Sequence, residues 1–219
     1  METPLTVFYT CDLRGDLDAL PRMQTFLRQL KALYGEDAVR VCADDPAPPG
    51  GRFLLLDIGG SCAPDVWHCD ASGGRSMPVA LDGMGYHAVN VSGFFAPDAR
   101  EKIGGSIQIA LVDDDHPADV DGIWLTTGSA TKNRHAGLHV RLAPADSTRL
   151  EGGTLWLARV SGRQIGVAKL TPIAGAWMLT AHDVHDLPAR VLPDPTIAGV
   201  IDFVKSEARY AQKRRNGGT

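Results

Sequence analysis

Two stretches of the chain decide the fold. One is Leu5-Thr-Val-Phe-Tyr-Thr10, which continues into Cys-Asp-Leu-Arg-Gly-Asp16, and the other is Phe53-Leu-Leu-Leu-Asp-Ile-Gly-Gly60. Each begins as a short run rich in apolar and β-branched or aromatic residues and ends in polar residues and glycine, which is typical of a strand that leads into a loop. The second run is almost entirely apolar, as expected of a strand that is buried on both faces.

Helical patterns follow these two strands. Apolar residues at i, i+3 and i+4 spacing predict an amphipathic helix over 20–33, and residues 74–84 predict a second one. A third short strand is predicted over 87–91. Alternating strands and helices indicate an α/β sheet with helices layered against it.

The second half of the chain has a different pattern. Turn residues separate six predicted strands, over 106–112, 122–127, 138–142, 154–160, 166–171 and 177–182, which suggests a second sheet with more antiparallel pairing. A closing helix is predicted over 194–210, with proline near its first turn. No internal repeat or linker interrupts the sequence, so we predict one domain over 1–210 and a solvated polar tail over 211–219.

Composition excludes several classes of function. The chain has 219 residues, of which 44% are hydrophobic and 22% charged, a balance that suits one globular domain. Its net charge of −4 offers no basic surplus for a phosphate backbone, so we expect no nucleic-acid partner. No apolar run reaches the roughly 18 residues of a membrane span. We therefore expect a cytoplasmic protein with no membrane partner, unless a leader has been removed.

The four cysteines are Cys11, Cys42, Cys62 and Cys69, and their spacings match no zinc framework. Free thiols in a reducing compartment are the favoured interpretation. A metal site at Cys62 and Cys69, which flank His68, is the alternative.

Three junctions between a strand and the following segment carry polar or glycine residues. They are 12–16, 57–61 and 90–94, each at the carboxyl end of one of the first three strands. Open α/β folds bind ligands at such ends. Because loop side chains are not needed for the core, their chemistry is informative about function.

On these residues the chain resembles the calcineurin-like metallophosphoesterases, specifically the catalytic domain of their 5′-nucleotidase branch. The resemblance runs through segments 7–17, 20–33, 53–60, 73–77 and 83–91, and it becomes thinner after about residue 95, where 153–166 and 193–197 are similar to the closing part of that family. It implies an α/β fold in which two packed mixed β-sheets are flanked by helices, in four layers ordered αββα.

That family uses two metal ions to clamp a phosphate and activate a water, so the resemblance implies metal ligands at the strand ends. Asp12 falls on the first aspartate of the family, Arg14 falls where its partner histidine belongs, and Gly60 falls on the aspartate that bridges the metals. Gly93 and Phe94 fall on the amide ligand and the catalytic histidine. Most of the expected ligands are therefore replaced by residues that cannot bind a metal.

One further ligand survives near the end of the pattern. The last histidine of the Gly-His-x-His motif maps to His139, within 136–139, while an earlier histidine would fall near Thr126 or Thr127. Asp12 and His139 are thus weak candidates for one shared metal, and two ligands are fewer than a tight site usually has. The permanent charge of Arg14 also opposes a cation, unless it replaces the metal as an anion clamp. We expect no cofactor and at most one weakly bound divalent metal.

Two other polar clusters were weighed as metal sites. Residues 182–186 carry two histidines and two aspartates, and residues 113–116 read Asp-Asp-Asp-His. For residues 182–186 the favoured interpretation is a strand end without a catalytic role. For residues 113–116 it is a solvated turn. For Phe94 and Phe95, filling of the core is favoured over an exposed contact surface.

These losses predict a metallophosphoesterase-like protein without its dinuclear site, acting as a binding or scaffolding module for an unknown protein or a small phosphorylated ligand. Whether it is an enzyme stays open, and inactivity is favoured. One alternative is a divergent phosphoester hydrolase of the 5′-nucleotidase type with a mononuclear or metal-free site. Another is a structural domain with a filled cleft, either monomeric or homodimeric.

Overall fold

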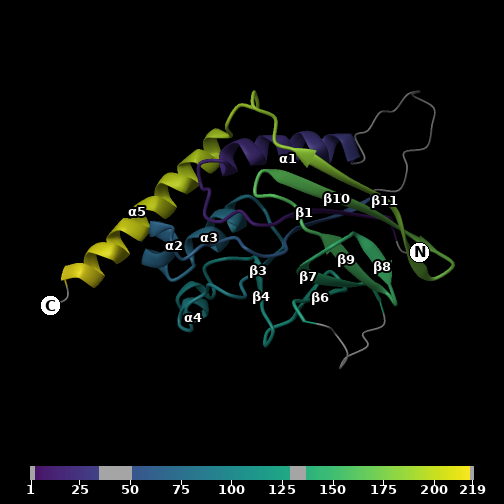
Figure 1. Ribbon diagram of the computed structural model, residues 1–219, viewed down its shortest axis with the longest axis horizontal. Helices are drawn as coiled ribbons and strands as arrows, with labels where there is room; N and C mark the ends of the chain where they lie inside the picture. The colour runs from purple at the N-terminus through teal and green to yellow at the C-terminus, as the bar shows by residue number, and fades with distance from the viewer. Residues whose placement is uncertain (1–2, 35–50, 129–136, 218–219) are drawn as a thin grey trace.

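The computed structural model describes residues 3–34, 51–128 and 137–217, and within them the chain forms two packed β-sheets with helices on one side (Figure 1). Sheet A has six strands in the order β11-β10-β1-β2-β3-β4. These are β1 (Leu5–Thr10), β2 (Arg52–Asp57), β3 (Ala88–Asn90), β4 (Ala110–Val112), β10 (Gln164–Ile173) and β11 (Ala176–Asp186). Strands β1 to β4 are parallel to one another, while β10 and β11 add an antiparallel hairpin at the β1 edge.

Sheet B has five strands in the order β5-β6-β7-β9-β8. These are β5 (Ala118–Val120), β6 (Ile123–Thr126), β7 (His139–Ala145), β8 (Arg149–Glu151) and β9 (Thr154–Ala158). The central strands β6, β7 and β9 are parallel, and the two edge strands are antiparallel to their neighbours. Both sheets are therefore mixed, as the fold prediction states.

Alternation along the strands of sheet A separates two cores. Val7 and Leu54 face sheet B and meet Leu125, Val140 and Leu155 in the core between the sheets. Because successive side chains of a strand point to opposite faces, their neighbours in sequence face the other way. The second core lies there, under the helices, and includes buried residues of β1, β2 and β3: Phe8, Leu55 and Val89.

The helices are α1 (Leu20–Tyr34), α2 (Trp67–Ser72), α3 (Ser76–Gly83), α4 (Ala99–Ile103) and α5 (Pro195–Gly217). Helix α1 buries Leu20, Met23 and Leu27 at the spacing predicted for it, and α3 buries Met77 and Leu81 in the same core. The prediction that the helices over 20–33 and 74–84 pack on the sheet of the first three strands is confirmed. No helix in the described part of the chain is both long and apolar enough to cross a bilayer.

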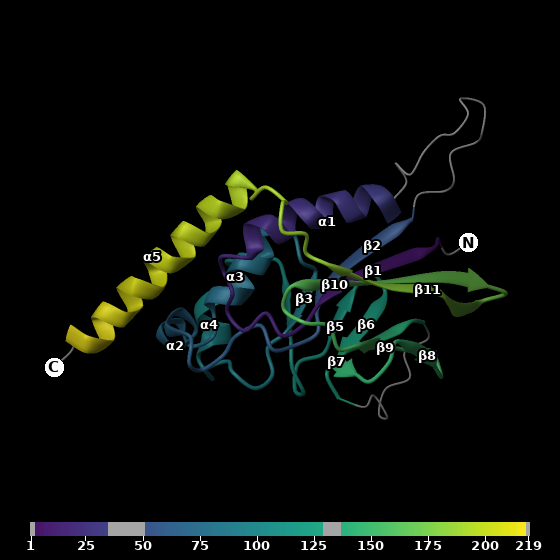
Figure 2. The same ribbon diagram turned by 45° about the horizontal axis from the view of Figure 1, so that its top comes forward.

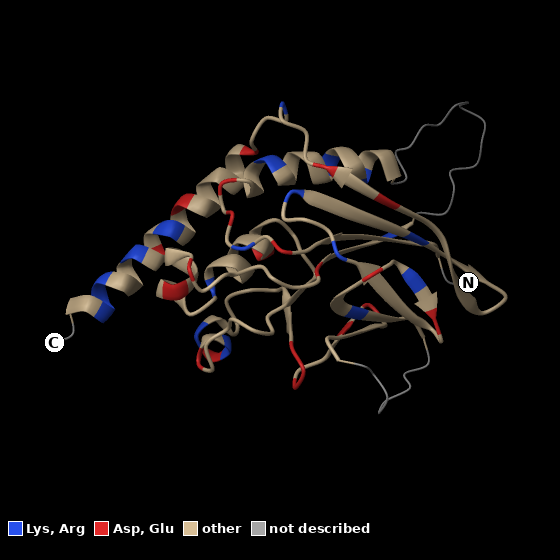
Figure 3. Ribbon diagram, viewed as in Figure 1, with Lys and Arg blue, Asp and Glu red and all other residues tan. Residues whose placement is uncertain are grey.

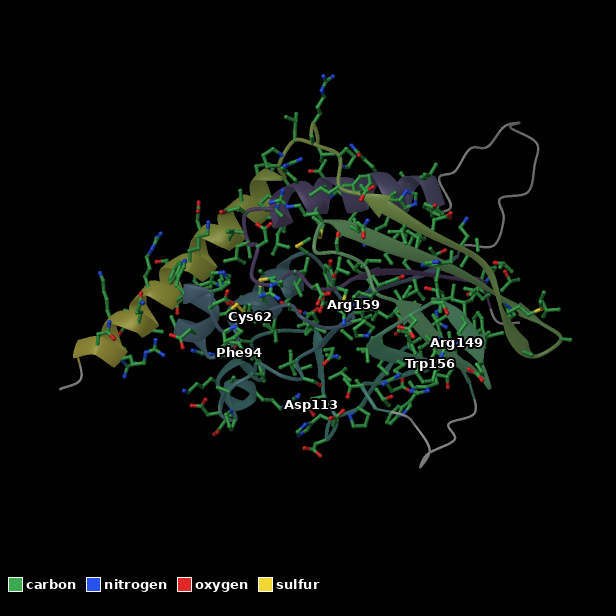
Figure 4. All side chains as sticks on the ribbon, viewed as in Figure 1. Cys62, Phe94, Asp113, Arg149, Trp156 and Arg159 are labelled. Carbon is green, nitrogen blue, oxygen red and sulfur yellow. A yellow bond between two sulfur atoms is a disulfide. The ribbon has the colours of Figure 1, made fainter. Side chains whose placement is uncertain are left out.

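The helical layer covers sheet A only. The buried core shared with sheet B contains no residue from a helix of the described chain, and Figure 2 shows α1, α3 and α5 all on the side of sheet A. The outer face of sheet B instead carries Trp156 of β9, which has Arg141 at 4.5 Å and Arg149 at 4.7 Å from its ring centroid (Figure 4). The described residues thus form three layers, and the fourth layer that the αββα prediction includes is not among them.

Several elements differ from the sequence prediction. Three strands assigned to the second sheet, β4, β10 and β11, belong to sheet A, and sheet B pairs its central strands in parallel. Helix α2 and helix α4 were not predicted, because each is only one or two turns long and shows no full amphipathic period. Helix α5 continues to Gly217 rather than ending at residue 210. Its last turns pair with α2 through Arg215 and Asp70, 2.5 Å apart, so most of the predicted tail is helical.

The contact between β1 and β10 depends on one glycine. Gly166 pairs with Tyr9 across the antiparallel ladder, and a Cβ atom at Gly166 would overlap the Tyr9 ring, which is fully buried. The Tyr9 hydroxyl is also held by the His182 imidazole at 2.9 Å. An aromatic ring that covers a glycine of the neighbouring strand in this way has no freedom to move aside.

We expect Gly166→Ala to destabilise the protein by about 1–3 kcal/mol, because the added methyl group overpacks a closed site. The matched change Gly199→Ala adds the same atom on the exposed side of α5, where nothing lies within 4 Å, and should stabilise by up to about 1 kcal/mol. Chemical denaturation of both variants measures the two free energies. Equal effects at the two positions would contradict this account of the β1–β10 contact.

Candidate functional site

The loops that follow β1 and β2 are joined by backbone hydrogen bonds. The N–H groups of Asp12, Arg14 and Gly15 donate to the carbonyls of Gly59, Gly60 and Ser61 at 2.8, 2.8 and 2.7 Å. The parallel ladder thus extends past the last strand residues. Asp12 and Arg14 adopt positive φ angles of 52° and 49°, which are uncommon for residues with a side chain. The two loops are therefore held close together at the place where the resemblance implies two metals.

Asp12 lies between two glycines. A Cβ atom at Gly60 would come within 2.5 Å of Asp12 Oδ1, and one at Gly162, in the loop after β9, would overlap the Asp12 carbonyl oxygen. Gly60 also has a φ of +74°, which other residues rarely adopt. An aspartate side chain at position 60 has no room in this arrangement.

Arg159 supplies the positive charge that faces Asp12. Its guanidinium forms an ion pair with the Asp12 carboxylate, and it lies at the end of β9, between the two sheets in Figure 4. Arg159 was not predicted as a site residue, because residues 154–160 are predicted as a strand. Its position just after a strand, in line with the loops after β1 and β2, is the signal that could have found it.

The predicted residue Arg14 does not point into a closed site. Its side chain is exposed, and it lines an open hollow of about 570 Å³ together with Asp12, Asp16 and Arg163. Arg163 pairs with Asp16 at 3.1 Å. Two guanidinium groups and two carboxylates therefore line this surface, where the resemblance implies two metals and their ligands.

The loop after β3 closes the remaining space. Phe94 and Phe95 are half-buried and pack against the core under the helices, which confirms that they fill space. Beside them a cavity of only about 20 Å³ is left between Gly60, Ser61 and Asn90. That is space on the scale of a single water molecule. Phe94 lies close below Cys62 in Figure 4, on the helix side of the loops.

Asn90 is engaged in holding the backbone. Its amide nitrogen donates to the carbonyls of Leu142 at 2.6 Å and Ile58 at 3.3 Å, and its Oδ1 accepts from the Ser92 N–H at 2.8 Å. Asn90 thereby links the loops of sheet A to β7 of sheet B. These bonds leave it little capacity to bind a ligand.

His139 lies far from Asp12. It begins β7 opposite Thr154, and its imidazole hydrogen-bonds to the Thr126 hydroxyl at 2.8 Å and the Thr154 hydroxyl at 3.0 Å. Arg159, the partner of Asp12, comes five residues after Thr154, which is about 16 Å along a strand. The structure therefore does not bring the two predicted metal-ligand candidates together. Residue 136, where the mapped motif begins, lies outside the described residues.

Asp57 is a buried carboxyl group that the sequence analysis quoted without giving it a role. It is completely buried, and it accepts hydrogen bonds from the hydroxyls of Ser61 at 2.5 Å and Thr10 at 2.9 Å and from the Gly59 N–H at 3.1 Å. Burial raises the pKa of Asp57 to about 7 against the lowering effect of these bonds, and the nearby charge of Asp12 raises it further. Because the group has no exposed surface, we assign it a structural role beneath the loops.

Two of the cysteines form a disulfide, so the prediction of free thiols is wrong for Cys62 and Cys69. A disulfide also removes the thiolates that a metal site with His68 would need. His68 is buried, and its Nε2–H donates to the Gly15 carbonyl at 3.0 Å, which leaves Nδ1 to accept from Ser76. Cys11 is a buried free thiol, and Cys42 lies outside the described residues.

The other two polar clusters are occupied by local contacts. His182 bonds to Tyr9 and Thr148, and His185 bonds to the Tyr34 hydroxyl at 2.8 Å, so the two histidines serve different neighbours. Asp113 accepts the backbone N–H groups of the turn that follows it and pairs with Arg100. Among the described residues, no group of three or more His, Cys, Asp or Glu side chains is arranged so that it could hold a metal ion. The residues at the strand ends do not fit the two metals that the resemblance implies.

We predict that Gly60→Ala costs more stability than Gly93→Ala. Both glycines have positive φ angles, 74° and 96°, so both substitutions strain the backbone. At Gly60 the added Cβ atom also comes into close contact with Asp12. At Gly93 nothing lies within 4 Å of an added Cβ atom. The strain alone costs about 1–3 kcal/mol, and the contact should add about 1–3 kcal/mol. Denaturant titration of both proteins tests this, and equal losses would show that the loops can separate.

We predict a pH dependence of stability that comes from Asp57. Its pKa of about 7 in the folded protein exceeds the ordinary 3.8, so between these values the folded state binds a proton that the unfolded chain has released. Stability from this group is therefore greatest at low pH and falls as pH rises toward 7, by at most about 1.4 kcal/mol per pH unit. Asp57→Asn should remove that slope in unfolding free energies measured across this range. Asp202→Asn, at an exposed position of α5, should leave the slope unchanged.

Comparison with models of protein families gives no match, and comparison with curated proteins gives none either. Among solved structures, the chain is similar to the calcineurin-like phosphoesterase YfkN from Bacillus subtilis, with a TM-score of 0.51 and 13% sequence identity. The match covers 97% of this chain and 100% of that chain. At such low identity the likeness concerns the fold alone, and the chain has the fold of a calcineurin-like phosphoesterase.

Proposed function

We propose that this protein is a metallophosphoesterase-like binding or scaffolding module that has lost the dinuclear metal centre of its fold. The observation that carries the proposal is the environment of Asp12. The one family carboxylate that remains at the strand ends is neutralised by Arg159, and Gly60 leaves no room for a bridging ligand. A guanidinium cannot activate a water as a metal does, because it offers neither a Lewis-acid site nor an open coordination position.

The alternative of a hydrolase without metals would need a nucleophile or a general base in contact with substrate. Burial raises the pKa of Asp57 to about 7, which would suit a general base, but the group has no exposed surface and its oxygens accept three hydrogen bonds. A general base must come within hydrogen-bond reach of the proton that it takes. This argues for the binding module rather than for the hydrolase.

The exposed arginines suit an anionic ligand. Arg14 and Arg163 line the open hollow beside Asp12, and guanidinium groups bind phosphate in a bidentate manner. A small phosphorylated ligand held there without being cleaved remains part of the proposal, as does a protein partner elsewhere on the surface.

We expect calorimetric titration with manganese to detect no tight two-site binding, either in the unmodified protein or in Arg159→Ala. Removing Arg159 takes away the competing charge but adds no ligand at Gly60, Gly93 or Phe94. Two equivalents of metal bound at micromolar affinity by either protein would contradict the loss of the centre.

We also expect turnover of p-nitrophenyl phosphate and of a nucleoside monophosphate to stay at background, with or without manganese. Loss of a metal that supplies both the nucleophile and charge stabilisation removes several kcal/mol of barrier lowering, and each ~1.4 kcal/mol is tenfold in rate. Asp12→Asn is the matched control, because asparagine tolerates the positive φ of this position. Activity that is present in the unmodified protein and absent from Asp12→Asn would establish the hydrolase instead.

A further inference from the structure

A long groove separates the C-terminal half of α5 from α4. It has a volume of about 940 Å³, and α2 and α3 form its floor. In Figures 1 and 2, α5 extends along the helical side of the molecule away from the sheets, with α2, α3 and α4 beside it. The groove lies on other elements than the loops around Asp12.

The α5 wall of this groove exposes large apolar side chains. Phe203 and Tyr210 each leave 60% of their surface exposed, and both line the groove. Glu207 lies four residues after Phe203 and three before Tyr210, and Arg214 lies four residues after Tyr210. At these spacings all four side chains share one face of the helix. Ile103 and Ile107 face them from α4 and the turn that follows it. Two exposed aromatics over one apolar hollow are typical of a surface that binds another molecule.

The charge of the groove is opposite to that of the whole protein. Its charged lining residues are Arg75, Lys102, Glu207, Arg214 and Arg215, four cationic and one anionic, in a chain whose net charge is −4. Lys102 pairs with Asp98 and Arg215 with Asp70, while Arg75 and Arg214 make no ion pair with the described residues. Figure 3 shows basic residues gathered along the last turns of α5 and on α4.

We propose that this α4–α5 groove binds an amphipathic helix of a partner protein whose polar flank is acidic. An apolar stripe at i, i+3 or i+4 and i+7 would lie against Phe203, Tyr210 and Ile103, with carboxylates facing Arg75 and Arg214. A second copy of this chain fits less well, because the cationic end of α5 would then face the cationic end of α5 in the other copy. A membrane surface is flat and would meet only the rim of the groove, leaving its floor on α2 and α3 uncovered.

This inference names a partner class for the binding role proposed above and rests on that role. The two are tested by different measurements. A groove that binds no peptide would leave the metal titration and turnover results unaffected, and a metal centre would not create or remove the groove.

The probe is a fluorescein-labelled synthetic peptide of about 18 residues, with leucine on one helical face and glutamate on the flanks. Its matched control carries lysine in place of glutamate. We expect the acidic peptide to bind in fluorescence anisotropy with micromolar affinity that weakens as salt rises, and at least tenfold more tightly than the lysine peptide. Failure of the acidic peptide to bind, or equal binding of both peptides, would overturn the proposal.

Variants locate the binding surface. Phe203→Ser with Tyr210→Ser should weaken binding at least tenfold. The control Leu33→Ser with Leu192→Ser changes two apolar residues outside the groove that are more exposed than Phe203 and Tyr210, and it should not weaken binding. Arg214→Glu should weaken binding more than Arg190→Glu, an exposed arginine that does not line the groove. Circular dichroism checks that each variant is folded. The proposal would be overturned if the groove variants and their controls weakened binding equally. It would also be overturned if the protein formed a dimer that the Phe203→Ser, Tyr210→Ser double variant dissociates.

Discussion

The close approach of the loops after β1 and β2 is the constraint on which the site depends. Three backbone hydrogen bonds continue the parallel ladder into these loops, and Asp12 is held between Gly60 and Gly162 as a result. In a dinuclear phosphoesterase a bridging carboxylate and two ions must fit between such loops. Here the loops meet directly, and Asp57 is sealed beneath them, where burial raises its pKa. Backbone contact thus joins these loops, where the resemblance implies two metals.

An ion pair accompanies the backbone contact between the loops. A carboxylate at the end of a strand is costly to leave without a positive partner when part of its surface is covered. Arg159 meets that requirement from sheet B, across the gap between the sheets, and needs no ion from solution. Asn90 makes a second connection between the same sheets through the Leu142 carbonyl. Side chains that belong to the protein thus hold together the edge where both sheets end.

Local sequence patterns predicted much of this fold, and the remainder depends on distant pairing. The spacing of Leu20, Met23 and Leu27 sufficed for α1, and the apolar run of β2 sufficed for a buried strand. The pairing of β10 with β1 depends on Tyr9 covering Gly166, a contact between residues more than 150 positions apart that no local period reveals. The inability of Gly60 to bind a metal follows from glycine itself, so the sequence indicated it. The contact of Arg159 with Asp12 depends on distant pairing, so the sequence did not indicate it.

The disulfide between Cys62 and Cys69 closes a short loop after β2, and its two cysteines are seven positions apart in the sequence. A cross-link of this length restricts the unfolded chain by an amount worth roughly 2–3 kcal/mol in the chain-entropy model. Such a bond forms in oxidising surroundings and is rare where thiols are kept reduced. Reduction of this bond would remove the covalent link between the loop after β2 and α2, the helix that also pairs with the end of α5.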